Sequence, residues 1–331
     1  MLAQVITCRG LRNIPELIFD SQLYYPRTER PKLKRWEYFP DDFETADLNS
    51  IVWWQNVADT IAATATQLQV DAVCSPAIVP NIYSDDYYAL MVKAAEYLEQ
   101  KMIPSAIAVL QTLIVRLADL SNESRVLSIA SIITSANIRR IYLVIISEIA
   151  PRREINDSEM LKGAMRLINL LETNGARVIV GFCSSDLILW KTAGAADCAT
   201  GKFWNLRRFS PARWDPNDAG APPIAYWFEE SLFTFLREPD LRRIVERNMH
   251  SEASRSNLYG QEVLERLARN KRQAWVALLL QLHFEVRTTF LGAADRRRGR
   301  IRTALTIAQL AKCNCKITAY PKGVRAWRTL R

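Results

Sequence analysis

The chain has few histidines, no apolar run long enough to span a membrane and no glycine-rich nucleotide-binding motif. It contains only two histidines, His250 and His283, so neither a Ser-His-Asp triad nor a multi-histidine metal centre is expected. No apolar run approaches the roughly 20 residues that span a bilayer, so we expect no membrane partner. The GxGxxG and GxxxxGK[ST] motifs are absent, and dinucleotide and P-loop nucleotide sites therefore have no motif support.

The cysteines also argue against a metal site. Of the six, only Cys313 and Cys315 are close in sequence, and a CxC pair without a third cysteine or a following histidine is a poor zinc site. We expect no metal and no cofactor. The N-terminal stretch lacks a charged segment followed by a long apolar one, so no secretory signal is expected. This favours a reducing cytoplasm and free thiols.

Positive charge is concentrated at the C-terminus. Residues 287–331 carry twelve Lys and Arg against one acid, which gives 12 − 1 = +11, whereas the formal net charge of the whole chain is +9. Tyr320 and Trp327 are interleaved with these basic residues. Such a region suits a phosphate backbone with stacked bases, with a solvated basic tail or a membrane-surface contact as the alternative. The candidate phosphate contacts are Arg296, Arg297, Arg298 and Arg300.

Short apolar runs alternate with amphipathic segments along the first two thirds of the chain. Strands are expected near 16–20, 71–76, 105–112, 138–148, 178–182 and 197–203, and helices near 48–69, 85–101, 157–175 and 184–194. The segment 123–134 mixes helix and strand signals. This alternation predicts parallel βαβ units, which fit a TIM-type (β/α)8 barrel better than an open sheet. We expect a barrel domain over 1–215 and a helical, basic, nucleic-acid-binding region over 216–331.

Polar side chains follow the expected strands, where parallel α/β folds place their chemistry. Asp20 and Glu148 are carboxylates that come directly after apolar strands, so burial and nearby charge can tune them for acid–base or nucleophilic work. A helix cap or a structural ion pair is the alternative for each. Lys202 lies at the end of the last expected strand.

Amides and arginines at the same edge extend this candidate site. Gln22 and Gln111 can read the edge of a base, or they can be solvent-exposed loop amides. Arg207 and Arg208 follow the last strand and can reach flanking phosphates, or they can belong to an exposed basic loop.

Several strand-end motifs resemble those of one known family. Asp20-Ser21-Gln22-Leu23-Tyr24 resembles a DSGGF/Y motif whose Asp takes part in catalysis, and the strand ending in Gln111 resembles one whose Gln contacts a base. The strand ending in Glu148 is similar to one ending in Gly-Glu, with Ser147 in place of the Gly. Gly181 to Gly194, with Asp186 inside it, resembles a G-x-P-x-D segment. Over roughly residues 15–210 the chain thus resembles the tRNA-guanine transglycosylase superfamily, whose TIM barrels break N-glycosidic bonds in nucleic acid.

The chain departs from that family at its nucleophile, at its base-reading acid and at its metal site. Ala199 stands where the family has its nucleophilic Asp, unless Asp197 substitutes through a shift in register. Cys74 and Ser75 stand where the family has a base-reading acid. The family's zinc cluster is also missing.

With these departures, the chain resembles the members of the superfamily that act on DNA. The first hypothesis is a DNA glycosylase that removes a flipped-out modified base, such as glucosylated hydroxymethylcytosine, in anti-phage defence. Asp20, Glu148 and Lys202 would be catalytic. The implied base contacts are Ser21, Gln22, Tyr24, Ser75, Gln111 and Phe182. The alternatives are a transglycosylase that exchanges a guanine-type base in DNA or tRNA, and a non-catalytic nucleic-acid-binding protein.

Overall fold

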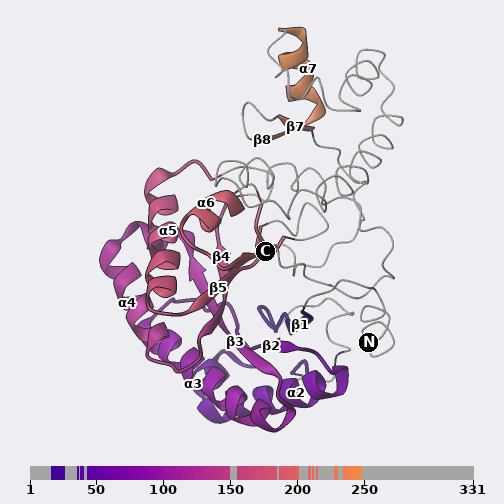
Figure 1. The fold of residues 1–331 in the computed structure, drawn as a ribbon, viewed down its shortest axis with the longest axis vertical. Helices are drawn as coiled ribbons and strands as arrows, with labels where there is room; N and C mark the ends of the chain where they lie inside the picture. The colour runs from indigo at the N-terminus through magenta and orange to yellow at the C-terminus, as the bar shows by residue number, and fades with distance from the viewer. Residues whose placement is uncertain are drawn as a thin grey trace, which may run out of the picture.

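A six-stranded parallel sheet forms the centre of the molecule. The structure is a computed structural model that describes residues 16–26, 36, 38–40, 43–149, 155–184, 186–200, 208–209, 211, 214, 227–229 and 234–247. The strands are β1 (Ile18–Phe19), β2 (Ala72–Cys74), β3 (Ala108–Arg116), β4 (Arg140–Ile146), β5 (Arg177–Val180) and β6 (Asp197–Cys198). They lie side by side in chain order and are all parallel. The sheet curls into a half-barrel (Figure 1).

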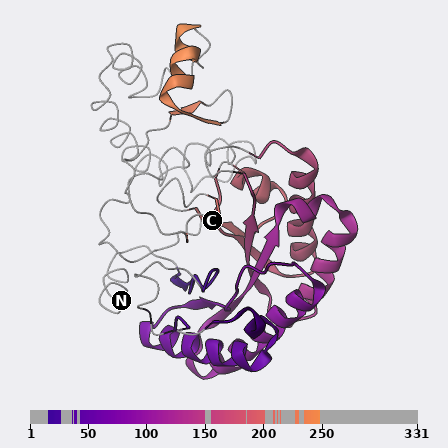
Figure 2. The same cartoon turned by 180° about the vertical axis from the view of Figure 1, so that it is seen from behind.

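Helices alternate with these strands and cover the convex side of the sheet. They are α2 (Ile51–Leu68), α3 (Asp85–Met102), α4 (Glu123–Thr134), α5 (Ser158–Thr173) and α6 (Leu187–Thr192), with short 3-10 turns η1 (Thr45–Asn49), η2 (Ile103–Ser105) and η3 (Leu117–Ser121). Figures 1 and 2 show α2 to α5 wrapped around the outside of the curl. This is the βα alternation that the sequence predicts, and the α/β class is confirmed.

Local sequence signals explain where the helices begin and end. The Asp157 side chain accepts hydrogen bonds from the backbone N–H groups of Glu159 and Met160, both at 3.0 Å, and so caps α5 as its position predicts. Gly175, with φ of 84°, follows the end of α5 in the left-handed region that glycine adopts at low cost. Ser84 caps α3 in the same way, by accepting from Tyr87 N at 3.1 Å.

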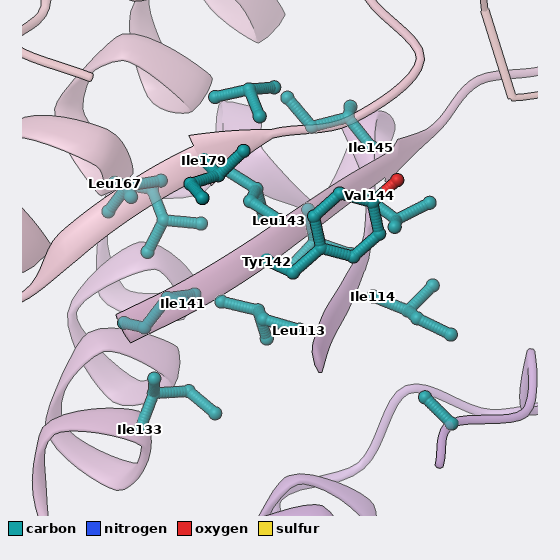
Figure 3. Close-up of a cluster of buried hydrophobic side chains, with 14 of the residues drawn as sticks. Leu113, Ile114, Ile133, Ile141, Tyr142, Leu143, Val144, Ile145, Leu167 and Ile179 are labelled. Carbon is teal, nitrogen blue, oxygen red and sulfur yellow. The ribbon is translucent and has the colours of Figure 1, made fainter. Parts of the chain in front are cut away.

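The two faces of the sheet have different roles. Residues paired across neighbouring strands share a face, and the faces alternate along each strand. Val73 and Val109 pack with helix residues such as Ala95 in one buried cluster, so their face is turned to the helices. Ile141 lies on that face as well, near Ile133 of α4 (Figure 3). The other face lines the inside of the curl.

One helix approaches the rest of the core unusually closely. Gly163 of α5 lies against the backbone of η3, and a Cβ added to it would overlap the carbonyl oxygen of Leu120. The flanking Ala164 and Leu167 are fully buried. The absence of a side chain at Gly163 therefore allows α5 to seat on η3.

Three expectations differ from the structure. The ambiguous segment 123–134 is the helix α4, capped by Asn122. β3 continues to Arg116, because the apolar, β-branched run after Gln111 extends the strand. The helical character expected over 216–331 is wrong at 227–229 and 234–236, and is met at 238–246. β7 (Trp227–Glu229) and β8 (Thr234–Leu236) pair antiparallel, and α7 (Glu238–Glu246) follows them.

The full eight-stranded barrel and the 215/216 domain boundary stay predictions. Among the described residues, no helix is long and apolar enough to cross a membrane.

Candidate functional site at the carboxyl edge of the sheet

Asp20 follows β1 and is held in place by two donors. Its Oδ1 accepts from the backbone N–H of Gln22 at 2.9 Å, and the Tyr24 hydroxyl lies 3.1 Å from each carboxylate oxygen. The backbone of Gln22 has φ of 57°, which turns the chain back toward Asp20. Both donors stabilise the ionised form of a carboxylate. Asp20 is therefore a partly buried, oriented carboxylate at the carboxyl edge of a parallel sheet.

An aromatic cluster surrounds Tyr24. Its ring makes edge-on contacts with Phe182, Phe209 and Trp214, at centroid distances of 6.1, 5.1 and 5.7 Å. Phe209 also pairs with Ile146 at the end of β4 in a parallel bridge, which puts Phe209 at the carboxyl edge of the sheet. These four aromatic side chains are almost completely buried. The base contacts predicted at Tyr24 and Phe182 thus correspond to buried rings.

Tyr142 is part of this region, and sequence reasoning missed it. It lies on the inner face of β4, and a Cβ added to Gly181 would come within 2.5 Å of its hydroxyl. Tyr142 also adds to the electrostatic environment of Tyr24, so the two phenols are neighbours. The available signal was one residue with a hydroxyl inside the otherwise apolar strand Ile141–Ile146.

Three further predicted base contacts, Ser75, Ser21 and Gln22, are buried at the ends of β2 and β1. The Ser75 hydroxyl accepts from Thr112 N at 2.9 Å, and the Thr112 hydroxyl donates to the Ser75 carbonyl at 2.7 Å. These bonds join the end of β2 to β3. Ser21 and Gln22 are buried in the turn after β1, so the exposed-amide alternative for Gln22 is wrong.

Gln111 lies away from this group. β3 extends past it, so it is not at a strand end, and pairing with Ile141 puts it on the helix-facing side of the sheet. Its side chain is fully buried, and both amide atoms lack a hydrogen-bond partner within the described part of the chain. The structure therefore does not bring Gln111 together with Asp20, and Gln111 is not an exposed amide either.

Glu148 is also separate from Asp20. It is exposed beyond the end of β4, and its charge acts on Arg116 at the end of β3. Arg116 itself binds Asp119 at 2.9 Å. The two predicted catalytic acids thus lie in different surroundings, one partly buried beside aromatic rings and one exposed beside an arginine.

Arg208 is buried instead of lying on an exposed basic loop. Its guanidinium is 3.7 Å from the Asp186 carboxylate, and both side chains are nearly buried. Asp186 in turn accepts from Ser184 N at 2.7 Å. In this position Arg208 fixes the segment that carries Phe209 and is turned away from solvent, so the phosphate contact expected of it has no support here.

The position of Ala199, at which the resemblance expects a nucleophilic acid, is apolar. Ala199 is buried next to the end of β6, and its N–H donates to Val180 O at 2.8 Å. The Asp197 carboxylate lies 3.7 Å from Arg177, the first residue of β5. Asp197 therefore interacts toward the amino end of the sheet, opposite the edge that carries Asp20.

The remaining predicted residues lie outside the described part of the chain. These are Lys202, Arg207, Arg296, Arg297, Arg298 and Arg300. Within the described residues, no group of three or more His, Cys, Asp or Glu side chains is arranged to hold a metal ion.

Buried phenols and thiols make the fold sensitive to alkali. Burial is the largest cause that raises the pKa of Tyr24 and of Cys74, and the Asp20 carboxylate raises both further. Burial likewise raises the pKa of Tyr87 and of Cys183. At neutral pH the Tyr24 hydroxyl therefore stays protonated and remains a donor to Asp20.

We expect the free energy of unfolding to fall as the pH rises above about 9. The ordinary pKa values are 9.0 for these thiols and 10.0 for these phenols, and the folded values are higher. The unfolded chain therefore loses these protons at a lower pH than the folded chain does. Between the two pKa values of each group, the free energy of unfolding falls by about 1.4 kcal/mol per pH unit. Urea denaturation at about pH 8 and about pH 10.5 measures the difference. Equal stability at the two pH values would contradict this assignment.

Comparison of the chain with protein-family models, with curated proteins and with solved structures finds no match.

Proposed function

We propose that this protein hydrolyses an N-glycosidic bond in nucleic acid, with a modified base in DNA as the favoured target, and leaves an abasic site. The observation that carries the proposal is the Asp20 carboxylate, partly buried at the carboxyl edge of the sheet and oriented by Tyr24 and Gln22. A fixed negative charge beside aromatic rings suits a reaction that develops positive charge on a sugar ring.

The chemistry requires one carboxylate and one water molecule. Water adds to C1′ of the sugar, the bond from C1′ to the base nitrogen breaks, and the base departs with a proton. Asp20 orients the water or stabilises the oxocarbenium-like transition state. Glu148 or Lys202 assists departure of the base; of these, Glu148 is exposed beside Arg116.

Two observations favour hydrolysis over base exchange. An exchange reaction of the family type uses a covalent nucleophile, and that position is the buried, apolar Ala199. Asp197, the nearest carboxylate in sequence, interacts with Arg177 at 3.7 Å. Water is then the simplest acceptor for the sugar.

A non-catalytic nucleic-acid-binding protein is the second candidate. Phe209 and Trp214 pack edge-on against Tyr24 beside Asp20, at 5.1 and 5.7 Å, where a flipped base would approach the carboxylate. If these rings stay in place, nucleic acid binds without reaction. This candidate predicts salt-sensitive binding that survives loss of Asp20 and Glu148 together.

The proposal also includes a complete TIM-type barrel, a phosphate-binding C-terminal stretch and a cellular compartment. The six parallel strands in chain order are consistent with the first six strands of a TIM-type barrel. The basic stretch 287–331 would hold phosphates. The cytoplasm is the proposed compartment, because reducing conditions suit the free, buried Cys74, Cys183 and Cys198.

Mass spectrometry of released bases tests the proposed function. The full-length protein is incubated with natural DNA, with DNA containing glucosylated hydroxymethylcytosine and with DNA containing 7-deazaguanine derivatives. A free base, together with strand breakage after alkali, is the expected result for one of the modified DNAs. Uptake of a labelled free base without abasic sites would indicate exchange, and binding without either product would indicate the non-catalytic candidate.

The variant Tyr24→Phe is expected to lower base release roughly tenfold to a hundredfold, because hydrogen bonds to charged groups contribute about 1.5–3 kcal/mol. Single-turnover base release measures the effect. Tyr97 provides a matched control, since its hydroxyl lies 3.2 and 3.1 Å from the two carboxylate oxygens of Asp59 on the outer helices. An equal loss in Tyr97→Phe would mean that the effect of Tyr24→Phe is one of stability.

A further inference from the structure

We propose that the loop between β2 and α3 carries a docking patch for an unpaired nucleobase, next to the nucleotide whose sugar reaches Asp20. This inference rests on the proposed function, because it names how the same edge of the sheet holds its nucleic-acid substrate. The patch consists of Tyr25, Val79, Ile82, Tyr83 and Arg116.

Ile82 is the most prominent member of the patch. Its side chain is 77 % exposed, the highest value among the large hydrophobic residues in the part of the chain that the structure describes. Tyr25, Val79 and Tyr83 are partly buried and pack against the core. The guanidinium carbon of Arg116 lies 5.8 Å from the centre of the Tyr83 ring, and 49 % of this arginine side chain is exposed.

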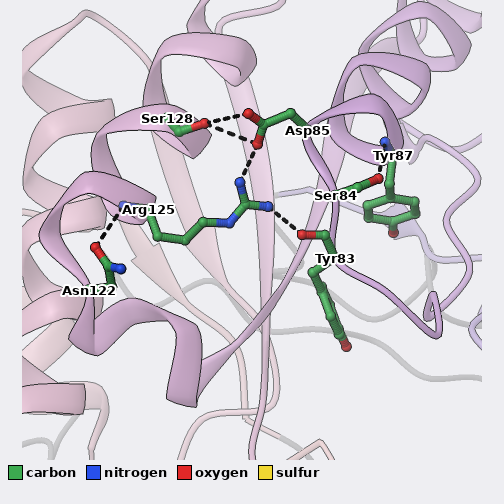
Figure 4. Close-up of polar contacts among 7 residues, drawn as sticks. All are labelled: Tyr83, Ser84, Asp85, Tyr87, Asn122, Arg125 and Ser128. Carbon is green, nitrogen blue, oxygen red and sulfur yellow. Dashed lines mark hydrogen bonds and ion pairs between the residues drawn. The ribbon is translucent and has the colours of Figure 1, made fainter.

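The loop is anchored on both sides of Ile82. On one side, Val79 N donates to Tyr24 O at 3.0 Å, and the Tyr87 hydroxyl donates to Ile78 O at 2.8 Å. On the other side, the Arg125 guanidinium donates to the Tyr83 carbonyl, as Figure 4 shows. Because these bonds fix the chain before and after it, Ile82 is presented outward by a supported loop.

The anchors also connect this loop to the turn that follows Asp20. Tyr24 binds Val79 through its backbone carbonyl and Asp20 through its hydroxyl. The loops after β1 and β2 therefore meet at Tyr24. A strand whose sugar lies at Asp20 would bring a neighbouring nucleotide over the patch.

The chemistry of the patch fits a base better than a phosphate. Aromatic rings and an arginine plane stack on any nucleobase, and apolar side chains such as Ile insert beside bases in nucleic-acid complexes. Of the nearby acids, the exposed Glu148 acts on Arg116. Two others are in ion pairs, since Asp119 binds Arg116 and Asp85 binds Arg125 and Ser128 (Figure 4). Their ion pairs reduce the repulsion that an approaching strand would meet.

Binding of single-stranded oligonucleotides tests the patch without requiring turnover. Fluorescence anisotropy compares the full-length protein with its Ile82→Ala variant, on an oligothymidine of about 12 nucleotides and on an abasic sugar-phosphate strand of the same length. We expect Ile82→Ala to weaken binding of the base-containing strand about fivefold or more, and to leave binding of the abasic strand unchanged. Because Ile82 is exposed, this variant is expected to fold.

Ile103 is the matched control. It is an isoleucine of similar exposure, 72 %, but it lies in η2 before β3, at the amino edge of the sheet. Ile103→Ala is expected to bind both strands like the unmodified protein. Equal affinities of the Ile82→Ala and Ile103→Ala variants for oligothymidine would overturn the proposal, as would an equal loss on the abasic strand.

Two further outcomes separate this patch from other surfaces and from the proposed reaction. Binding to phosphatidylserine vesicles that depends on Ile82, with oligonucleotide binding unaffected, would identify a membrane contact and overturn the nucleobase assignment. If no DNA releases a base while Ile82-dependent binding of oligothymidine persists, the glycosylase proposal fails and the patch stands. If a base is released but oligonucleotide binding does not depend on Ile82, the patch proposal fails and the glycosylase proposal remains.

Discussion

Replacing Asp20 by Asn is expected to lower base release roughly 100- to 1,000-fold, the range for removing one oriented electrostatic group from a reaction centre. Asparagine keeps the size of the side chain and can still accept from Gln22 N and Tyr24, the two groups that hold Asp20. What it removes is the negative charge that stabilises a cationic sugar. Single-turnover release of the modified base measures the loss, and affinity for the same DNA is expected to change little.

Asp59 supplies the control for this prediction. Its carboxylate has the same kind of tyrosine partner, Tyr97, and also binds Lys101 at 3.0 Å. However, Asp59 lies on the outer helix α2, and both partners lie on the outer helix α3. Asp59→Asn is expected to leave base release unchanged. Full activity of Asp20→Asn would remove Asp20 from the mechanism, and a loss of DNA affinity equal to the loss of rate would favour a binding role.

The order of strands and helices could be predicted because each signal is local. The buried strands are short apolar runs, and the helices carry their own caps, such as Asp157 before α5 and Gly175 after it. The position of Asp20 at the carboxyl edge follows from the same signals, since it comes directly after the apolar residues of β1. These features depend on neighbours in sequence.

The environment of the site residues could not be predicted, because it depends on contacts across the fold. Gln111 is turned to the helices because its register opposite Ile141 puts it on that face of the sheet, and β3 continues past it to Arg116. Arg208 is buried because its neighbour Phe209 pairs with Ile146 of β4 and its own guanidinium lies 3.7 Å from Asp186. In the sequence, Arg208 is one of two adjacent arginines in a polar segment, and this pattern does not indicate that it is buried.

The same dependence on packing explains why the aromatic cluster was incompletely predicted. Tyr24 and Phe182 were identified from their motifs, whereas Phe209 and Trp214 reach them from a segment far along the chain. The antiparallel pair β7 and β8 was missed for a related reason. Its two strands have only three residues each, and that length is too short for periodicity to distinguish a strand from a helix.

The variant Gly163→Ala is expected to destabilise the fold by about 3 kcal/mol, although alanine normally favours a helix by up to about 1 kcal/mol over glycine. Gly163 lies in the interior of α5, where the backbone is helical and alanine itself is not strained. The cost comes from the neighbour, since the new methyl group would overlap the carbonyl oxygen and carbon of Leu120 in η3. Backbone atoms cannot rotate away as a side chain can, so α5 would have to move off η3, with Ala164 and Leu167 losing part of their packing.

Urea denaturation of the full chain measures this effect, with Lys162→Ala as the neighbouring control in the same helix. The Lys162 side chain is 70 % exposed and pairs only on the surface with Glu159, so its replacement is expected to change the free energy of unfolding by no more than about 0.5 kcal/mol. Helix propensity favours alanine at both positions, and more strongly over glycine, so a loss of stability confined to Gly163→Ala reports the close approach at Gly163. If Gly163→Ala were as stable as the unmodified protein or more so, α5 and η3 would be farther apart than the structure places them. In that case the packing of α5 against η3 would need revision.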